Sequence, residues 1–292
     1  MTRFGGPDVL EFGEVERPSP ISTEVLVRVV AAGVNPVDCK TRRGEGVARW
    51  VAPPPFVLGW DVCGVVEAMG YGVARFAVGD LVYGMPRFPR AAGAYAEFVT
   101  APSLQLARVP AGVSPIEAAA LPLAALTAWQ CLVDAADLRE GQTVLVHGAS
   151  GGVGHIAMQI ASSRGACVVA TGGRADREAL ATRDADVALD LVGGPDTLAL
   201  VDTLRRGGVL LAVADGATDE VRRAAETRGV RVVEPLVEPD GRALDEISML
   251  VGSGSLKVSI DKTFPLQRAA AAHERLERGG VRGKLVLEVS HR

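Results

Sequence analysis

The chain has 292 residues, a formal net charge of −4, 48% hydrophobic residues and 34 glycines. This length suits about two domains, and the acidic balance without a basic stripe excludes an obvious nucleic-acid partner. No apolar run reaches the roughly 18 residues that a membrane span needs. The first residues lack the apolar core of a signal peptide, and the cysteines are scattered without a C-x-x-C pair. We therefore expect a cytoplasmic protein with reduced thiols.

The first 110 residues or so are predicted to form an all-β domain with irregular loops. Alternating apolar residues predict a strand over residues 24–30, and residues 56–69 and 80–83 are further candidates, separated by Gly and Pro. A helical stretch then begins at Ser114, which is a plausible N-cap with Pro115 at the first helical position and Glu117 three residues on. The Ala- and Leu-rich residues 118–132 continue it as a buried helix, broken near Pro122.

A glycine-rich turn follows a short apolar strand at residues 143–147. Gly148, Gly151, Gly152 and Gly154 form the turn, and apolar residues at helical spacing follow from Val153. A strand, a glycine turn and a helix in this order make a phosphate cradle, because backbone N–H groups at the helix start face the anion. We predict a dinucleotide site; the alternative is a tight turn that binds nothing.

Strands and helices alternate after this turn. This alternation predicts a parallel, doubly wound sheet, with strands at 167–171, 187–191, 209–213 and 230–234 and helices at 195–205 and 218–228. Only residues 175–185 are available where a third strand and its crossover are expected, so either that unit is absent or sequence is missing. A helix at 244–251 follows, and strands at 257–264 and 284–289, with a helix at 266–278 between them, are predicted to return to the first domain.

Several motifs in a fixed order carry a family resemblance. They are Phe4-Gly-Gly-Pro-Asp-Val-Leu10, Ala32-Gly-Val-Asn-Pro-Val-Asp38, Leu58-Gly-Trp-Asp-Val-Cys-Gly64, Val78-Gly-Asp-Leu-Val82, Gly93-Ala-Tyr-Ala-Glu97, Ala118-Ala-Ala-Leu-Pro122, Leu126-Thr-Ala-Trp129, the glycine turn and Gly283-Lys-Leu-Val-Leu287. The chain resembles the zinc-independent quinone oxidoreductases of the medium-chain dehydrogenase/reductase superfamily. The resemblance implies an α/β fold in which a GroES-like β-rich catalytic domain (1–117 and 257–292) accompanies a doubly wound Rossmann domain (118–256).

The residues expected at a metal site are absent. Zinc-dependent relatives place a Cys and a His-Glu pair in the catalytic domain, and the matching positions here are Asn35 and Trp60-Asp61. Indole does not ligate zinc, and an amide is a poor ligand. We expect no metal.

The cofactor expected from the sequence is NADPH. NAD-specific enzymes carry an acid after the second strand, whereas this chain has Gly173 and Arg174 there. Arg174 can pair with the 2′-phosphate; the alternative is an ordinary solvated charge. The cofactor-binding candidates are Gly148, Ser150, Gly151, Gly152, Val153, Gly154, Gly173, Arg174, Val192, Val213 and Lys284.

Hydride transfer needs few protein groups, because the cofactor carries the chemistry. Asn35 is the first catalytic candidate, since its amide can donate to a carbonyl oxygen; the alternative is a turn residue before Pro36. Thr127 resembles the family's nicotinamide-side threonine, and its alternative is a hydroxyl bonded to its own helix. Asp38, Trp60 and Tyr95 are substrate-pocket candidates, with a core role as the alternative for Tyr95.

The resemblance implies NADPH-dependent reduction of a small quinone or an activated alkene (enone). One alternative is an enoyl reductase that acts on a carrier- or CoA-linked substrate. Another is an NADPH-binding protein with little turnover, because the chain is short after Arg174. We also expect a homodimer, paired through an apolar edge strand at residues 230–234.

Overall fold

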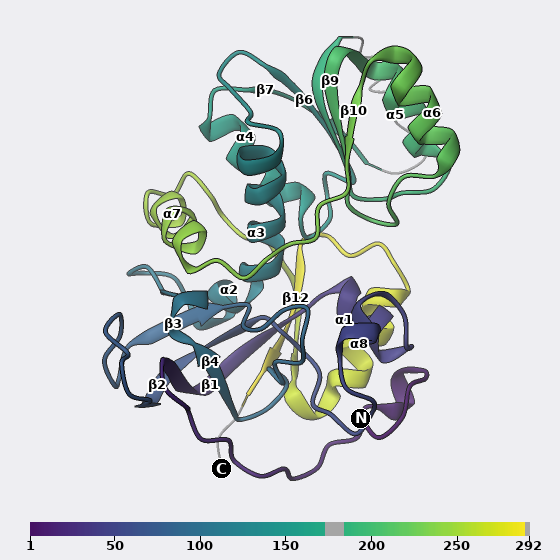
Figure 1. Ribbon diagram of the computed structural model, residues 1–292. Coiled ribbons are helices and arrows are strands. Elements are labelled where there is room, and N and C mark those ends of the chain that lie inside the picture. The colour runs from purple at the N-terminus through teal and green to yellow at the C-terminus, as the bar shows by residue number, and fades with distance from the viewer. Residues whose placement is uncertain (173–183, 290–292) are drawn as a thin grey trace. The chain divides into compact units, whose positions relative to one another are not determined.

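The computed structural model describes residues 1–172 and 184–289 (Figure 1). The chain forms two compact units: Met1–Leu126 with Glu238–Arg292, called here the β-rich unit, and Thr127–Val237, called the parallel-sheet unit. No helix among the described residues is both long and apolar enough to cross a membrane.

The β-rich unit is built on a seven-stranded sheet in which β1 is central. The strand order is β11-β12-β1-β2-β3-β5, and β4 also pairs with β1. The pairs are antiparallel except β11 with β12. Nearly every β1 side chain is buried, because the strand is apolar along almost its whole length. The strands are β1 (Glu24–Val34), β2 (Val62–Met69), β3 (Leu81–Gly84), β4 (Phe98–Pro102), β5 (Leu106–Arg108), β11 (Ile260–Pro265) and β12 (Lys284–Glu288).

The expectation that the first 110 residues are all β is wrong, because a helix, α1 (Pro36–Arg42), follows β1 directly. Asn35 is its N-cap residue, Pro36 its first residue, and the Asp38 carboxylate accepts from the Asn35 backbone N–H. This is a recognisable helix-start pattern. Short 3₁₀ turns also lie at Pro7–Val9, Gly46–Trp50, Ser103–Gln105 and Leu266–Arg268.

The predicted helical stretch after Ser114 is confirmed. Its hydroxyl accepts from the Glu117 N–H, and the Glu117 side chain accepts from the Ser114 N–H. Pro122 divides the stretch into two helices, as expected from its missing N–H. The elements are α2 (Pro115–Ala120), α3 (Pro122–Trp129) and a π-helical turn (Gln130–Ala135).

The parallel-sheet unit has the predicted doubly wound topology. Its five parallel strands lie in the order β10-β9-β8-β6-β7, and no third-strand unit lies among the described residues. Figure 1 shows α4 near β6 and β7, while α5 and α6 lie side by side near β9 and β10. The elements are β6 (Thr143–His147), α4 (Gly154–Ser163), β7 (Cys167–Thr171), β8 (Ala185–Asp190), α5 (Asp196–Thr203), β9 (Leu204–Ala212), α6 (Asp219–Arg228) and β10 (Arg231–Val233).

The two units divide at different places from the expected domain boundaries of 117/118 and 256/257. The chain passes from one unit to the other within α3, after Leu126, and returns after Val237. The reason is packing: α2 lies against β1, β2 and β12, and α7 (Gly241–Gly252) lies against β5. The last helix, α8 (Ala269–Glu277), packs on β11 and β12 and contacts α1.

Candidate active site

The glycine turn at the end of β6 needs glycine at two places. Gly148 has a φ of +90°, which side-chain-bearing residues rarely adopt. A Cβ on Gly154 would lie 2.2 Å from the Gly148 carbonyl oxygen and 2.7 Å from the Ala149 Cα. The N–H groups of Gly148 and Ala149 both donate to the Thr171 carbonyl, which ties the turn to the end of β7.

The turn leaves a row of backbone donors at the start of α4. Within residues 1–172 and 184–289, the N–H groups of Gly152, Val153 and Gly154 have no hydrogen-bond partner. Unpaired N–H groups at a helix start, with the positive end of the helix dipole, favour a bound anion such as a pyrophosphate. The local geometry therefore fits the cofactor site that the sequence predicts.

Asp190 fixes the loop that faces this turn. Its Oδ1 accepts from the N–H groups of Val192 (3.0 Å) and Gly193 (2.9 Å), and its Oδ2 accepts from the Thr197 hydroxyl (2.5 Å). The Val192 side chain approaches the turn, since a Cβ on Gly148 would lie 3.0 Å from it. Val213, another predicted cofactor residue, donates its N–H to the Asp190 carbonyl. These predicted residues thus gather at the carboxyl ends of β6, β8 and β9.

Two predicted cofactor residues, Gly173 and Arg174, lie outside the described residues. The 2′-phosphate contact of Arg174 therefore stays a prediction. Just before them, Thr171 at the end of β7 is buried, and its hydroxyl lies 2.6 Å from Nδ1 of His147.

In the β-rich unit, Asn35 lies in a buried polar cluster with Asp61 and Lys284. Its Nδ2 donates to Asp61 Oδ2 (2.9 Å), and its Oδ1 accepts from the Lys284 ammonium, which also lies 3.5 Å from Asp61 Oδ2. The N–H of Leu123 donates to the other Asp61 oxygen. Burial raises the pKa of Asp61, and Lys284 opposes that effect. Among the described residues, one Nδ2 hydrogen of Asn35 has no hydrogen-bond partner. Lys284, which is predicted to bind the cofactor, instead pairs with Asn35 and Asp61 inside this unit.

Asp38 is completely buried beside this cluster. Its Oδ2 accepts from the Asn35 backbone N–H (2.7 Å) and from the Tyr95 hydroxyl (3.1 Å), whereas its Oδ1 has no partner among the described residues. Burial raises the pKa of Asp38 to about 7; the Asn35 N–H opposes this, and the neighbouring Asp61 adds to it. The predicted pocket residues Asp38 and Tyr95 are therefore in direct contact.

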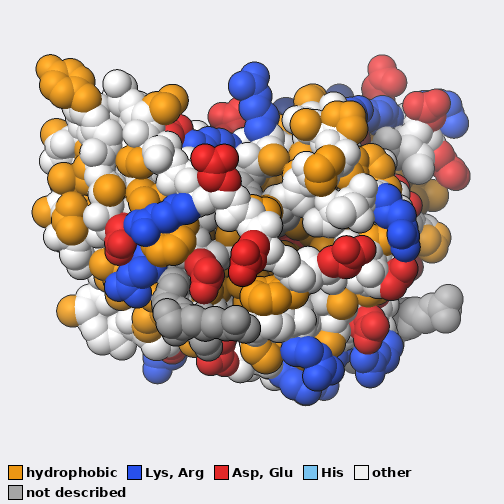
Figure 2. Space-filling view, turned by 90° about the horizontal axis from the view of Figure 1, so that it is seen from below, with side chains coloured by type: hydrophobic (Ala, Val, Ile, Leu, Met, Phe, Trp, Pro, Cys, Tyr) orange, Lys and Arg blue, Asp and Glu red, His pale blue; other side chains and the backbone are white. Residues whose placement is uncertain are grey.

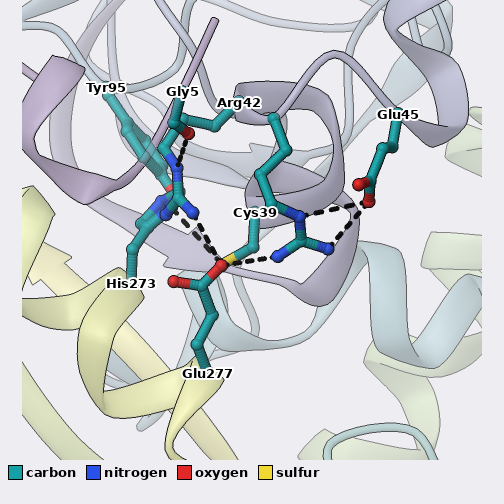
Figure 3. A network of polar contacts seen from close by, with 8 residues as sticks. Gly5, Cys39, Arg42, Glu45, Tyr95, His273 and Glu277 are labelled. Carbon is teal, nitrogen blue, oxygen red and sulfur yellow. Dashed lines mark hydrogen bonds and ion pairs between the residues drawn. The ribbon is translucent and has the colours of Figure 1, made fainter.

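A polar network extends from Tyr95 toward α8 (Figure 3). The Tyr95 hydroxyl lies 3.3 Å from His273 Nε2, and Arg42 Nη1 lies 3.1 Å from His273 Nδ1. Arg42 also donates to Glu277 (2.6 Å) and to the Gly5 carbonyl (3.1 Å). Burial and the Arg42 guanidinium lower the pKa of His273 to about 3, so its ring is neutral. Sequence reasoning did not single out His273 or Glu277, and it placed Arg42 at the start of a pocket loop rather than at the end of α1.

The remaining predicted site residues are Trp60 and Thr127. Trp60 is buried, donates its Nε1–H to the Arg90 carbonyl (2.7 Å) and packs edge-on against Phe88. Thr127 is buried on α3, in the parallel-sheet unit. Their contacts with substrate or cofactor stay predictions.

In the part of the chain that the structure describes, no group of three or more His, Cys, Asp or Glu residues is placed to hold a metal ion. All four cysteines are free thiols. On the face shown in Figure 2, basic and acidic side chains are interspersed rather than gathered by sign.

Comparisons with known proteins place the chain in a family. Residues 21–111 match the alcohol dehydrogenase GroES-like domain, and residues 160–287 match the family described as zinc-binding dehydrogenase. The chain is 31% identical to the quinone oxidoreductase of Mus musculus over 319 positions, which cover 97% of this chain and 95% of that protein. The chain belongs to the quinone oxidoreductase family. The predicted fold class is thereby confirmed.

Two further relatives extend this comparison. The chain is 34% identical to the 2-methylene-furan-3-one reductase of Solanum lycopersicum. The alignment covers 98% of this chain and 77% of that protein. A mycobacterial protein solved in complex with NADPH has a TM-score of 0.86 and 30% identity, with 98% of each chain covered. The alignment with the mouse protein is longer than this 292-residue sequence, so the mouse protein has residues without a counterpart in it.

Proposed function

We propose that this family member is a zinc-independent, NADPH-dependent oxidoreductase that reduces a quinone or an activated alkene. The observation that carries the proposal is the row of unpaired N–H groups at Gly152, Val153 and Gly154, which suits the pyrophosphate of a dinucleotide. NADPH, when bound, supplies the hydride. The NADPH complex of the mycobacterial relative supports this choice of cofactor.

The chain's own residues would bind the cofactor and contact the reacting groups. The glycine turn binds the pyrophosphate, and Asp190 holds Val192 against the turn. Asn35 is proposed to contact the acceptor, and the resemblance gives Thr127 the role of a contact to the nicotinamide. Because one Nδ2 hydrogen of Asn35 has no partner within residues 1–172 and 184–289, it can donate a single bond to the oxygen that gains charge.

The first test is NADPH titration of the purified protein, followed by NADPH oxidation with 9,10-phenanthrenequinone, 1,4-benzoquinone and 2-enals. Gly154→Val is expected to weaken NADPH binding by about tenfold or more, which corresponds to about 1.4 kcal/mol, because its side chain would displace turn backbone. Gly13→Val is the matched control, since a Cβ there meets no atom within 4 Å. Binding without turnover on every acceptor would reject the oxidoreductase proposal, and activity lost on treatment with a chelator would reject zinc independence.

The class of hydride acceptor, a quinone or an activated alkene, needs a test of its own. The 34% identity to a reductase named for a methylene-furanone favours an activated alkene at least as much as a quinone. Comparing kcat/KM for 2-enals with that for quinones tests this choice. Preference for a CoA-linked enoyl substrate would instead support the enoyl reductase alternative.

We also propose a homodimer and a cytoplasmic location. Among the described residues, β10 pairs only with β9, so its other edge is available for two-fold pairing with a second copy. A monomer mass in light scattering would contradict the dimer. The four free thiols suit a reducing compartment, and localisation of a tagged chain tests that assignment.

A further inference from the structure

The hydrogen bonds of the network between α8 and α1 run in one direction. A guanidinium donates and never accepts, so Nδ1 of His273 must accept from Arg42. Because the ring is neutral, its single hydrogen is then on Nε2, which donates to the Tyr95 hydroxyl oxygen. The Tyr95 O–H in turn donates to Asp38 Oδ2. The donors thus run in order from Arg42 through His273 and Tyr95 to Asp38.

This chain of hydrogen bonds is not a route for protons from the surface. Arg42 stands between Glu277 and His273, and a guanidinium does not release its proton in proteins. Cys39, whose Sγ lies 3.3 Å from His273 Nδ1, is no alternative entry, because it is buried and burial raises its thiol pKa to about 12. The series of hydrogen bonds therefore serves to hold its side chains in position, because aligned hydrogen bonds strengthen one another in a buried site.

The series of hydrogen bonds from Arg42 to Asp38 ends at the first turn of α1. Asp38 Oδ2 accepts from Tyr95 and also from the backbone N–H of Asn35, the residue that precedes α1. Each donor on this oxygen restrains the carboxylate, and the carboxylate restrains the Asn35 backbone. Lys284 and Asp61 hold only the Asn35 side chain.

We propose that His273 is a positioning residue for the reduction: through Tyr95 and Asp38 it orients Asn35 toward the acceptor. The inference deepens the proposed function and rests on it for its catalytic part. The geometric part, that His273 and Tyr95 restrain the Asn35 backbone N–H, is independent of turnover.

Substitutions separate the directed hydrogen bonds from packing. His273→Leu fills space but can neither accept from Arg42 nor donate to Tyr95, whereas the amide of His273→Gln can do both. Tyr95→Phe keeps the ring, which packs against Gly59, and removes only the hydroxyl. Tyr83→Phe is the matched control, because the Tyr83 hydroxyl is also bonded in this unit, to the Leu244 carbonyl and to Ser248.

Two measurements on the full chain test the proposal. In hydrogen–deuterium exchange, Tyr95→Phe and His273→Leu are expected to raise exchange of the Asn35 amide about tenfold or more, as a lost restraint of about 1.4 kcal/mol implies. In steady-state assays with 1,4-benzoquinone, the same variants are expected to lower kcat by roughly 100-fold, the effect of about 1 Å of misplacement. KM for NADPH is expected to stay unchanged in these variants. His273→Gln is expected to restore most of the protection of the Asn35 amide and most of kcat.

The outcomes are distinguishable. The positioning role would be overturned if His273→Leu and Tyr95→Phe changed amide exchange and kcat no more than Tyr83→Phe does. It would also be overturned if His273→Gln failed to restore amide exchange and kcat. If the wild-type chain turns over no acceptor, the proposed function and the catalytic part of the inference fail, and amide exchange still decides the restraint on Asn35.

Discussion

The Asp38 carboxyl should make this protein less stable as the pH rises through neutrality. The group is completely buried, its Oδ1 has no partner among the described residues, and the Lys284 ammonium is paired with Asn35 and Asp61. Burial is the main reason that its pKa rises from 3.8 to about 7, since a charged carboxylate loses its hydration there. Asp38→Asn removes the ionisation and keeps the size of the side chain.

The sign and size follow from proton linkage. Between pH 3.8 and about 7 the folded chain keeps the Asp38 proton and the unfolded chain has lost it. The folded state then binds one more proton, so stability from this group falls by about 1.4 kcal/mol per pH unit. The stabilisation that the protonated Asp38 contributes to the folded state is fully present below pH 3.8 and lost above pH 7. It amounts to about 4 kcal/mol.

Urea unfolding of the wild type and Asp38→Asn at several pH values from 4.5 to 8 measures this difference. The free energy of unfolding of Asp38→Asn should rise relative to the wild type by about 3 kcal/mol across that range, because most of the window lies within it. Asp8→Asn, at a side chain that is 72% exposed, controls for loss of a negative charge. A difference between the wild type and Asp38→Asn that does not change with pH would refute the reasoning.

Three further outcomes are expected. Asp190→Ala should weaken NADPH binding and lower the unfolding free energy by roughly 2–4 kcal/mol, because three donors lose their acceptor; unchanged NADPH titration would contradict its loop role. Lys284→Met should lower the unfolding free energy by about 3–5 kcal/mol by leaving Asp61 unpaired. Adding Asp61→Asn should recover part of that loss in urea melts, and a strictly additive double variant would argue against the pair. Arg174→Ala should weaken NADPH far more than NADH in parallel titrations, and equal effects would refute the phosphate contact.

Elements that depend only on neighbouring residues could be predicted from the amino-acid sequence. The strand, glycine turn and helix from Thr143 to Ser163 are as predicted, because a glycine requirement and helical periodicity are local properties. The cap at Ser114 is local in the same way. Even α1 carried a local signal in Asn35, Pro36 and Asp38, but its seven residues are too few to show a helical period.

The surroundings of Asn35, in contrast, depend on contacts between residues that are far apart in the chain. Arg42 and His273 are 231 positions apart, and Lys284 is 249 positions from Asn35, so no spacing along the chain relates them. The charge of Asp38 is likewise set by burial rather than by neighbours in sequence. Pairing of β12 with β1 and packing of α8 beside α1 bring these groups together. Local patterns therefore predicted the glycine turn and its flanking elements, whereas long-range packing created the polar network that holds the candidate catalytic amide.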